Sequence, residues 1–353
     1  MRGILPTGDV SPVRLFGWLA VLTLLCNHPK AFRNKLLQDQ KTSKPSQKQP
    51  IKSTEMPQPL EGDDRGSPNS ADEEMPGDED VYTLGFSEDM KTRMLATIPE
   101  EAPVELSYRM MLVRQIIELA EKAKDKTLIF SHSIATLNCM EELLDEMGFI
   151  WARIDGSKAM KARNKVLDDF KAGSIDVLLI STRAGGLGLN IQTANRVIIL
   201  DYGFNPTWEE QAIGRAYRLG QVKPVFVYRF VAGGTFEKRL YEMGLFKTGL
   251  ASRVVDKKNP TRHAARNPQQ WIAAPTEVLQ EDLDDVGGDK EVLDQILAKH
   301  HAGQDSFIRA IKTMETLQRE ADDEPLDEQE QREVAEEIEA LLMRKGPSST
   351  IPL

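Results

Sequence analysis

The chain has 353 residues, of which 40% are hydrophobic and 28% are charged, so it is long enough to bury one sizeable core and a second small one. Its two cysteines, Cys26 and Cys139, exclude a disulfide framework and a cysteine-based zinc site and favour a reducing compartment. The formal net charge is -10, yet residues 105–258 hold 23 Lys and Arg against 18 Asp and Glu, so a mildly basic middle that suits nucleic acid lies between acidic flanks.

The first 37 residues are predicted to be helical. The apolar run from Leu15 to Cys26 has the length of a signal-peptide core, but no small-residue cleavage site follows it, which favours a buried helix. Residues 38–104 are rich in Pro, Ser, Gln and acid and contain almost no large apolar side chains. Such a segment cannot bury enough surface to offset its ordering entropy, so we predict a disordered low-complexity insert.

Residues 105–252 alternate between strand and helix patterns. Five apolar runs of strand length are separated by amphipathic stretches: KTLIFSH, IWARIDG, IDVLLIST, RVIILDY and VFVYRFVA. Runs that are apolar almost throughout predict an α/β fold, with a parallel sheet covered by helices on both faces. Ligands of such a sheet bind at the carboxyl ends of the strands. A linker is predicted at 253–275 and an acidic helical tail at 276–353.

The stretch STRAGGLGLN follows the third apolar run and contains three glycines. Ser181 and Thr182 offer hydroxyl groups at the end of the strand, and Arg183 offers a positive charge. The glycines permit positive φ and a close approach of the backbone to a bulky anion. Taken alone, the same stretch is also typical of a tight turn between a strand and a loop.

The stretch QAIGRAYRLGQ places Gln211, Arg215 and Arg218 in a helical pattern. The two arginines are three residues apart, so they are predicted to share one helix face and to converge on one anionic group. Guanidinium groups suit phosphate oxygens because each presents a planar fork of donors. A solvated surface pair, neutralised by Glu209 and Glu210, is the alternative interpretation.

The stretch RIDGSKAMKARNKVLDDF leaves a strand at Gly156 and Ser157 and then continues into a basic helix. That helix contains Arg163 and three lysines, which can contact phosphates of a nucleic-acid backbone without reading bases. A helix face that only keeps the protein soluble is an equally good interpretation of this charge run.

The order and spacing of these stretches, together with LLCNHPKAF, resemble the second RecA-like lobe of the Swi/Snf-type chromatin-remodelling and recombination-repair ATPases, within helicase superfamily two. The resemblance covers residues 24–28 and 110–252. It implies a RecA-like parallel sheet, ATP in a cleft between two lobes, and double-stranded DNA across both. It also implies a nuclear location.

The resemblance also assigns roles to individual residues. Arg215 and Arg218 match the arginine fingers that stabilise charge on the transferred γ-phosphate, and Gln211 belongs to the same motif. The implied nucleotide contacts are Gly186, Gly188 and Asn190. The implied DNA contacts are Ser131, Gly156, Ser157, Arg163, Ser181, Thr182 and Arg183.

Several positions depart from the family pattern. Gly214 stands where Asp is usual, Tyr217 where His is common and Phe204 where Trp is frequent. His132 stands where Gln is usual, and a single His at a strand end is more often structural than catalytic.

The motifs of a first lobe are missing from the 353 residues, which contain no Gly-Lys-Ser/Thr phosphate loop and no Asp-Glu box after an apolar strand to hold Mg²⁺. We therefore expect half of an ATP hydrolase, inactive alone, that needs a first RecA-like lobe. The alternative is a non-catalytic module that binds DNA and uses its acidic tail for protein partners. A further hypothesis is that this tail folds over the basic face and competes with DNA; a tail that faces histones or only keeps the protein soluble is the alternative.

Overall fold

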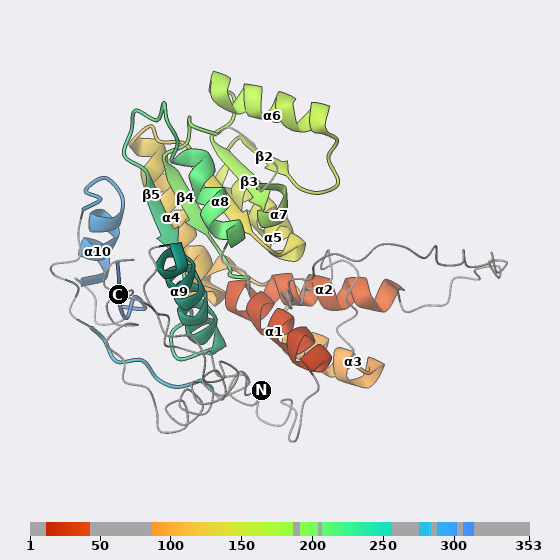
Figure 1. The fold of residues 1–353 in the computed structure, drawn as a ribbon. Helices are drawn as coiled ribbons and strands as arrows, with labels where there is room; N and C mark the ends of the chain where they lie inside the picture. The colour runs from red at the N-terminus through yellow and green to blue at the C-terminus, as the bar shows by residue number, and fades with distance from the viewer. Residues whose placement is uncertain are drawn as a thin grey trace, which may run out of the picture.

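The computed structural model describes residues 12–42, 86–185, 191–203, 207–255, 275–281, 283, 288–301 and 306–313. At its centre is a five-stranded parallel sheet with the strand order β2-β3-β1-β4-β5 (Figure 1). The strands are β1 (Thr127–Ser131), β2 (Trp151–Ile154), β3 (Val177–Ser181), β4 (Arg196–Ile199) and β5 (Phe226–Arg229). The predicted α/β fold with a parallel sheet is confirmed.

Helices cover both faces of the sheet, as predicted. One face carries α4 (Tyr108–Lys122), α5 (Ile134–Met147) and α10 (Leu293–His301). The other carries α1 (Pro12–Asn27), α6 (Met160–Ala172), α7 (Thr182–Gly185), α8 (Thr207–Ala216) and α9 (Phe236–Val255). In β1, Leu128 and Phe130 point into the second core and Ile129 into the first, because successive side chains of a strand face opposite ways.

The predicted buried helix at the N-terminal end is α1, which packs with α2 (Pro29–Thr42). Among the described residues, no helix is both long and apolar enough to cross a membrane. Val21 and Leu24 of α1 join Phe32 and Leu36 of α2 in a third, smaller core. This core connects the N-terminal helices to α5 of the lobe.

The prediction of disorder for 38–104 is wrong for Glu88–Thr97, which forms α3. Ser87 caps this helix by accepting a hydrogen bond from the Met90 N–H at 3.3 Å. From α2, Arg33 donates to the Leu95 carbonyl at 3.0 Å, so the helix is attached to the lobe by tertiary contacts that composition does not reveal. The middle of the predicted insert lies outside the described residues.

His28, between α1 and α2, is buried and accepts one hydrogen bond while donating another. Its Nδ1 accepts from the Lys30 N–H at 3.1 Å, and its Nε2 donates to the Pro103 carbonyl at 3.1 Å. Protonation of Nδ1 would break the bond from Lys30. Burial lowers the pKa of His28 below its ordinary value of 6.5, and the Pro103 carbonyl opposes this shift only in part.

We expect the free energy of unfolding to fall between about pH 7 and about pH 5, because the unfolded chain binds a proton at His28 more readily than the folded chain does. A His with a lowered pKa stabilises the folded state above the unfolded pKa, and this stabilisation is lost as the pH falls. The variant His28→Gln, which has no group that titrates in this range, is expected to show a smaller fall. Urea unfolding of both proteins across this range measures the effect; equal pH slopes would contradict it.

After α9 the chain returns to the lobe as a C-terminal strap, by which we mean the described residues between 275 and 313. The Thr276 N–H donates to the Gly234 carbonyl at 2.9 Å. Gly234 has φ +66, and a Cβ atom there would lie 2.0 Å from the Thr276 carbonyl oxygen, so only glycine admits the strap at this point. Val292 and Ile296 are buried in the core between the strap and α4.

The predicted helical tail is wrong for 306–313, which the structure shows as irregular chain. The Glu281 N–H donates to the Arg309 carbonyl at 2.8 Å, and the Gln280 side-chain amide donates to the Ile308 carbonyl at 2.9 Å. These carbonyls therefore bond to a neighbouring segment of the strap instead of to a helical turn. Most of the predicted linker and the end of the tail lie outside the described residues.

Candidate functional site

The turn after β2 brings together three of the predicted DNA contacts. Ser157 directs both its N–H and its hydroxyl to Asp155 Oδ1, at 3.0 and 2.5 Å. Arg163 of α6 donates to the carbonyls of Asp155 and Gly156 at 3.0 and 3.2 Å. Burial would raise the pKa of Asp155, but the hydrogen bonds from Ser157 lower it overall. Arg163 is buried and thus shapes the turn from inside, while Gly156 and Ser157 are exposed.

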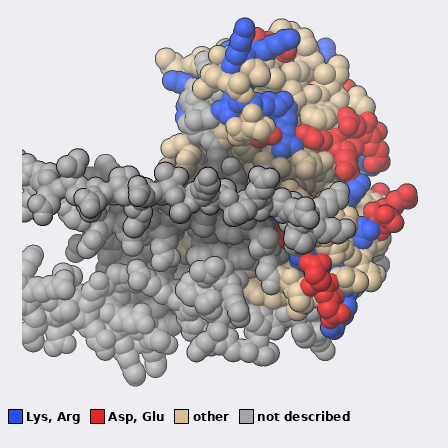
Figure 2. Space-filling view, turned by 90° about the vertical axis from the view of Figure 1, so that its right-hand side faces the viewer, with Lys and Arg blue, Asp and Glu red and all other residues tan. Residues whose placement is uncertain are grey.

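The surface charge of this region comes from the lysines around the start of α6. Lys161 and Lys165 are exposed and Lys158 is half-buried. In Figure 2, Lys and Arg side chains gather at the top of the view, the end of the molecule that α6 occupies in Figure 1, and acidic side chains gather lower on that face. The basic side chains thus lie where a nucleic-acid backbone can reach them.

Ser131 has an internal contact rather than an exposed hydroxyl. It ends β1, is fully buried, and donates to Asp201 Oδ2 at 2.6 Å. The main-chain N–H of His132 donates to the other carboxylate oxygen of Asp201 at 2.6 Å. The side chains of Ser131 and Asp201 therefore hold the carboxyl ends of β1 and β4 together, which positions the loop after β1.

The glycine-rich stretch is described at both ends. Ser181 ends β3 and Thr182 begins the short α7, and both side chains are buried. Arg183 lies on α7, with no side-chain placement described. The nucleotide contacts that the resemblance implies for the glycine-rich stretch lie outside the described residues; they are Gly186, Gly188 and Asn190. Where the chain is described again, the Ile191 N–H donates to the Arg215 carbonyl at 3.2 Å, so the loop ends against the arginine helix.

The arginine motif is only partly helical, which corrects the prediction for Arg218. Gln211 and Arg215 are four residues apart on α8 and share a face. The helix ends at Ala216, and Arg218 lies in the following turn. Gly220 in this turn has φ +104. The side chain of Gln221 holds the turn by donating to the carbonyls of residues 192, 194 and 216 at 2.8, 2.7 and 3.4 Å.

The predicted arginine fingers and the predicted DNA contacts lie at opposite ends of the strands. The Gly203 N–H, just after β4, donates to Glu209 near the start of α8 at 3.0 Å. The end of α8 lies beside Ala194, just before β4. Arg215 is therefore near the amino ends of the strands, whereas the predicted DNA contacts lie at the carboxyl ends. The position expected for ligands, at the carboxyl ends of the strands, therefore matches the predicted DNA contacts but not Arg215.

Arg218 and Arg215 differ in their surroundings. The Arg218 side chain is exposed and makes no ion pair with the described residues, while Arg215 is half-buried at the end of α8. Tyr217 and Leu219 on either side of Arg218 are also exposed, at 74% and 96%. A cation between exposed apolar side chains is suited to an anionic ligand held against another surface.

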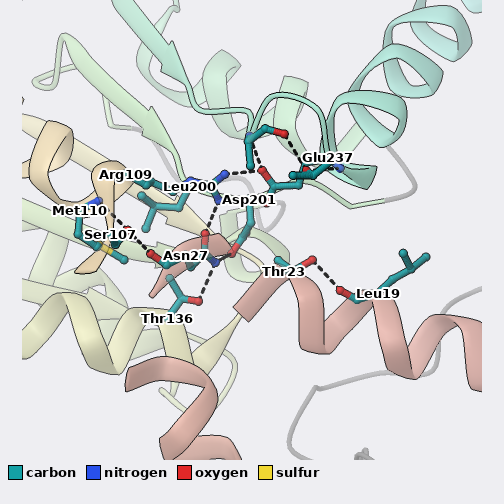
Figure 3. A network of polar contacts seen from close by, with 12 residues as sticks. Leu19, Thr23, Asn27, Ser107, Arg109, Met110, Thr136, Leu200, Asp201 and Glu237 are labelled. Atoms are coloured by element: carbon teal, nitrogen blue, oxygen red, sulfur yellow. Dashed lines mark hydrogen bonds and ion pairs between the residues drawn. The ribbon is translucent and has the colours of Figure 1, made fainter. Parts of the chain in front are cut away.

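Sequence reasoning missed a buried polar network at the centre of the lobe (Figure 3). Asn27, the last residue of α1, donates to Asp201 Oδ2 at 2.8 Å and to Thr136 at 2.9 Å. Arg109 of α4 donates to the Leu200 carbonyl at 2.7 Å and pairs with Glu237 of α9. The network joins four helices, α1, α4, α5 and α9, to the residues just after β4.

The charges in this network are almost completely buried. The side chains of Arg109 and Glu237 are 5% and 2% exposed. Burial alone would lower the pKa of Arg109, but the Glu237 carboxylate raises it above its ordinary value. Asn27 lies in the stretch LLCNHPKAF, and this was the only sequence signal for a member of the network. The pairing of Arg109 with Glu237 left no signal, because the two residues are 128 positions apart in the sequence.

The C-terminal strap packs beside α4 and β5, and β5 is one edge strand of the sheet. Helix α6 packs beside β2, which is the opposite edge strand. The described part of the tail therefore does not cover the predicted DNA contacts. The hypothesis that the tail competes with DNA stays a prediction for the rest of the tail, which lies outside the described residues. The strap, like the rest of the described chain, contains no cluster of three His, Cys, Asp or Glu that could hold a metal ion.

Comparisons with known proteins agree with this fold. Residues 109–220 match the helicase conserved C-terminal domain. Over 270 residues the chain is 34% identical to CHROMATIN REMODELING 20 of Arabidopsis thaliana, covering 64% of this chain and 18% of that protein. It is 37% identical over 189 residues to the mouse transcriptional regulator ATRX, covering 46% of this chain and 8% of ATRX. With helicase ARIP4 of Xenopus tropicalis, 35% identity extends over 203 residues, or 50% and 14% of the two chains.

A solved structure of the C-terminal part of the Fun30 ATPase domain is 27% identical, with a TM-score of 0.40, and the match covers 44% of this chain and 51% of that one. The parallel sheet and the match at residues 109–220 make this part of the chain similar to the C-terminal lobe of helicases. Over the aligned residues the chain is similar to the Swi/Snf-type lobe that its motifs resemble. The chain spans less than a fifth of the length of the three relatives compared above.

Proposed function

We propose that this lobe forms one wall of an ATP site whose other wall belongs to another RecA-like lobe, and that it grips duplex DNA as part of a chromatin-remodelling or DNA-repair translocase. The observation that carries the proposal is the position of Arg215 and Arg218. Both lie at one end of α8, against the end of the glycine-rich loop.

The arginines would act on phosphate charge. Their guanidinium groups present forks of N–H donors that match the γ-phosphate oxygens, where charge develops during transfer. ATP, bound with Mg²⁺ on the opposite lobe, supplies the phosphoryl group and the energy of hydrolysis. Arg215 is held at the end of a helix, and Arg218 by a turn that Gln221 fixes, so little reorganisation is needed when the lobes close.

The DNA contacts would come from residues at the carboxyl ends of the strands. Ser157 is exposed in the turn that Arg163 supports, and Lys161 and Lys165 continue the basic surface along α6. Contacts of this kind go to phosphates, so they support weak sequence preference and strong salt dependence. Double-stranded DNA in chromatin is therefore the proposed partner, and the nucleus the proposed location.

Supplying a first lobe tests this function. The full chain is mixed with, or joined to, the first RecA-like lobe of a Swi/Snf-type ATPase, and ATP hydrolysis is measured with and without duplex DNA. We expect hydrolysis that needs both lobes and rises with DNA, because the 353 residues contain no phosphate loop of the Gly-Lys-Ser/Thr type. DNA binding without hydrolysis in any combination would instead identify a non-catalytic binding module.

A further inference from the structure

A chain of ion pairs begins in the C-terminal strap; its first two pairs are buried, and it ends at Lys223, whose side chain is 47% exposed. Asp289, which is 4% exposed, accepts a hydrogen bond from Arg196 Nη1 at 2.5 Å and another from the Tyr228 hydroxyl. It also accepts from the Leu293 N–H at 3.2 Å, at the start of α10. The strap therefore docks through a carboxylate that simultaneously caps its own helix.

Arg196, the first residue of β4, contacts both Asp289 of the strap and Asp125 of the lobe. Its side chain is 2% exposed, lies over the ring of Phe226, and donates through Nε to Asp125 Oδ2 at 2.7 Å. Both ends of the guanidinium are thus engaged by carboxylates, one from the strap and one from the loop before β1. Removing one carboxylate would leave part of this buried charge uncompensated, which is strongly destabilising.

Asp125 completes the path to the arginine turn. Its second oxygen accepts from Lys223 Nζ at 2.8 Å, and Lys223 also donates to the Lys124 carbonyl at 2.9 Å. Burial would raise the pKa of Asp125, but hydrogen bonds from Lys223 and Arg196 lower it overall. Lys223 lies two residues after Gln221, whose side chain holds the turn that contains Arg218.

We propose that the C-terminal strap orders the arginine turn, residues 217–223, through the path Asp289–Arg196–Asp125–Lys223. Asp289 is then a positioning residue for Arg218, acting across the sheet from a segment that lies outside the helicase C-terminal match at 109–220. The consequence for ATP hydrolysis rests on the proposed function. The ordering itself does not, because it needs neither nucleotide nor a second lobe.

Such a path makes the strap a regulatory element. Undocking the strap would remove one of the two carboxylates that hold Arg196, and the released guanidinium would compete with Lys223 for Asp125. The turn would then lose the contact that anchors its far end. A protein that bound residues 289–296 and held them away from the lobe would make the arginine turn less ordered, although it would not contact the turn itself.

Hydrogen exchange of the full chain measures this coupling. Three amides report on the turn through bonds of 3.0 Å: Tyr217 to the Ile213 carbonyl, Gln221 to the Arg218 carbonyl, and Lys223 to Gln221 Oε1. In the variant Asp289→Asn we expect exchange at residues 217–223 to rise about fivefold or more, with β1 and β3 unchanged. The matched control is Lys312→Met, which removes a strap ion pair with Glu281 that lies off the path and should leave the turn unchanged.

A double variant tests the path itself. If Asp289 acts through Lys223, then Lys223→Met alone raises exchange in the turn, and adding Asp289→Asn raises it little further. Unchanged exchange at 217–223 in Asp289→Asn would overturn the proposal. So would an equal rise in β1 and β3, which would indicate general destabilisation, or fully additive effects in the double variant.

Discussion

Replacing Arg218 with alanine is expected to lower kcat for ATP hydrolysis by about 10³ to 10⁵ in a two-lobe assembly that contains this chain, the range found for arginine fingers. The physical reason is that the guanidinium stabilises charge that develops on the γ-phosphate only in the transition state. Arg218→Lys should recover little of the loss, because an ammonium group does not reproduce the planar fork of donors. Steady-state kinetics at saturating ATP and DNA gives the measurement.

The control for this variant is another exposed arginine. Arg93 lies on α3, where its side chain is 78% exposed and pairs with Asp89, and Arg93→Ala is expected to leave kcat unchanged. Arg218→Ala and Arg93→Ala should also bind DNA with the same affinity, because Arg218 lies near the amino ends of the strands, away from the predicted DNA contacts. If Arg218→Ala kept more than about a tenth of the activity, the role given to this arginine would be wrong.

Breaking the buried ion pair between Arg109 and Glu237 is expected to destabilise the folded lobe by about 3 to 5 kcal/mol. In Glu237→Gln the guanidinium stays buried, 5% exposed, with no carboxylate to balance its charge. Glu237 also accepts from the Ala232 N–H at 2.8 Å, so the connection between β5 and α9 is weakened at the same time. Urea unfolding followed by circular dichroism measures the change in unfolding free energy.

A paired replacement separates lost charge balance from lost packing. Because an ion pair in a dry core is often no better than apolar side chains of similar size, Arg109→Met with Glu237→Leu should recover part of the stability lost in Glu237→Gln. The recovery is only partial, because the Leu200 carbonyl and the Ala232 N–H lose their partners. A loss below about 1 kcal/mol in Glu237→Gln would show that water reaches this site and that the pair is not buried in solution.

The fold was predictable because the buried strands leave a simple signal. Every residue of β1 and β3 is buried, so these strands are apolar and easily told from the amphipathic helices around them. The ends of α5 and α6 are local features of the same kind, since each helix ends at a glycine in the left-handed region, Gly148 with φ +74 and Gly173 with φ +94. These features depend on neighbours in sequence, which is the range over which patterns can be interpreted.

The features that could not be predicted depend on distant partners. The polar network needs Asn27, Arg109 and Glu237 from three separate helices, and of these residues only Asn27 lies in a stretch that the sequence analysis singled out. The docking of the strap on the lobe could not be predicted from the acidic tail pattern, because it rests on Asp289 and on Arg196, 93 residues away. The end of α8 was placed too late, since the contacts of Gln221 that form the turn reach back to residues before β4.

The most direct measurement is a structure of this chain joined to a first RecA-like lobe, with Mg²⁺, a non-hydrolysable ATP analogue and duplex DNA bound. The account predicts that the guanidinium groups of Arg215 and Arg218 lie about 2.7 to 2.9 Å from γ-phosphate oxygens, with the DNA backbone against the turn at Ser157. Nucleotide bound elsewhere, with both arginines beyond hydrogen-bonding distance of its phosphates, would contradict it.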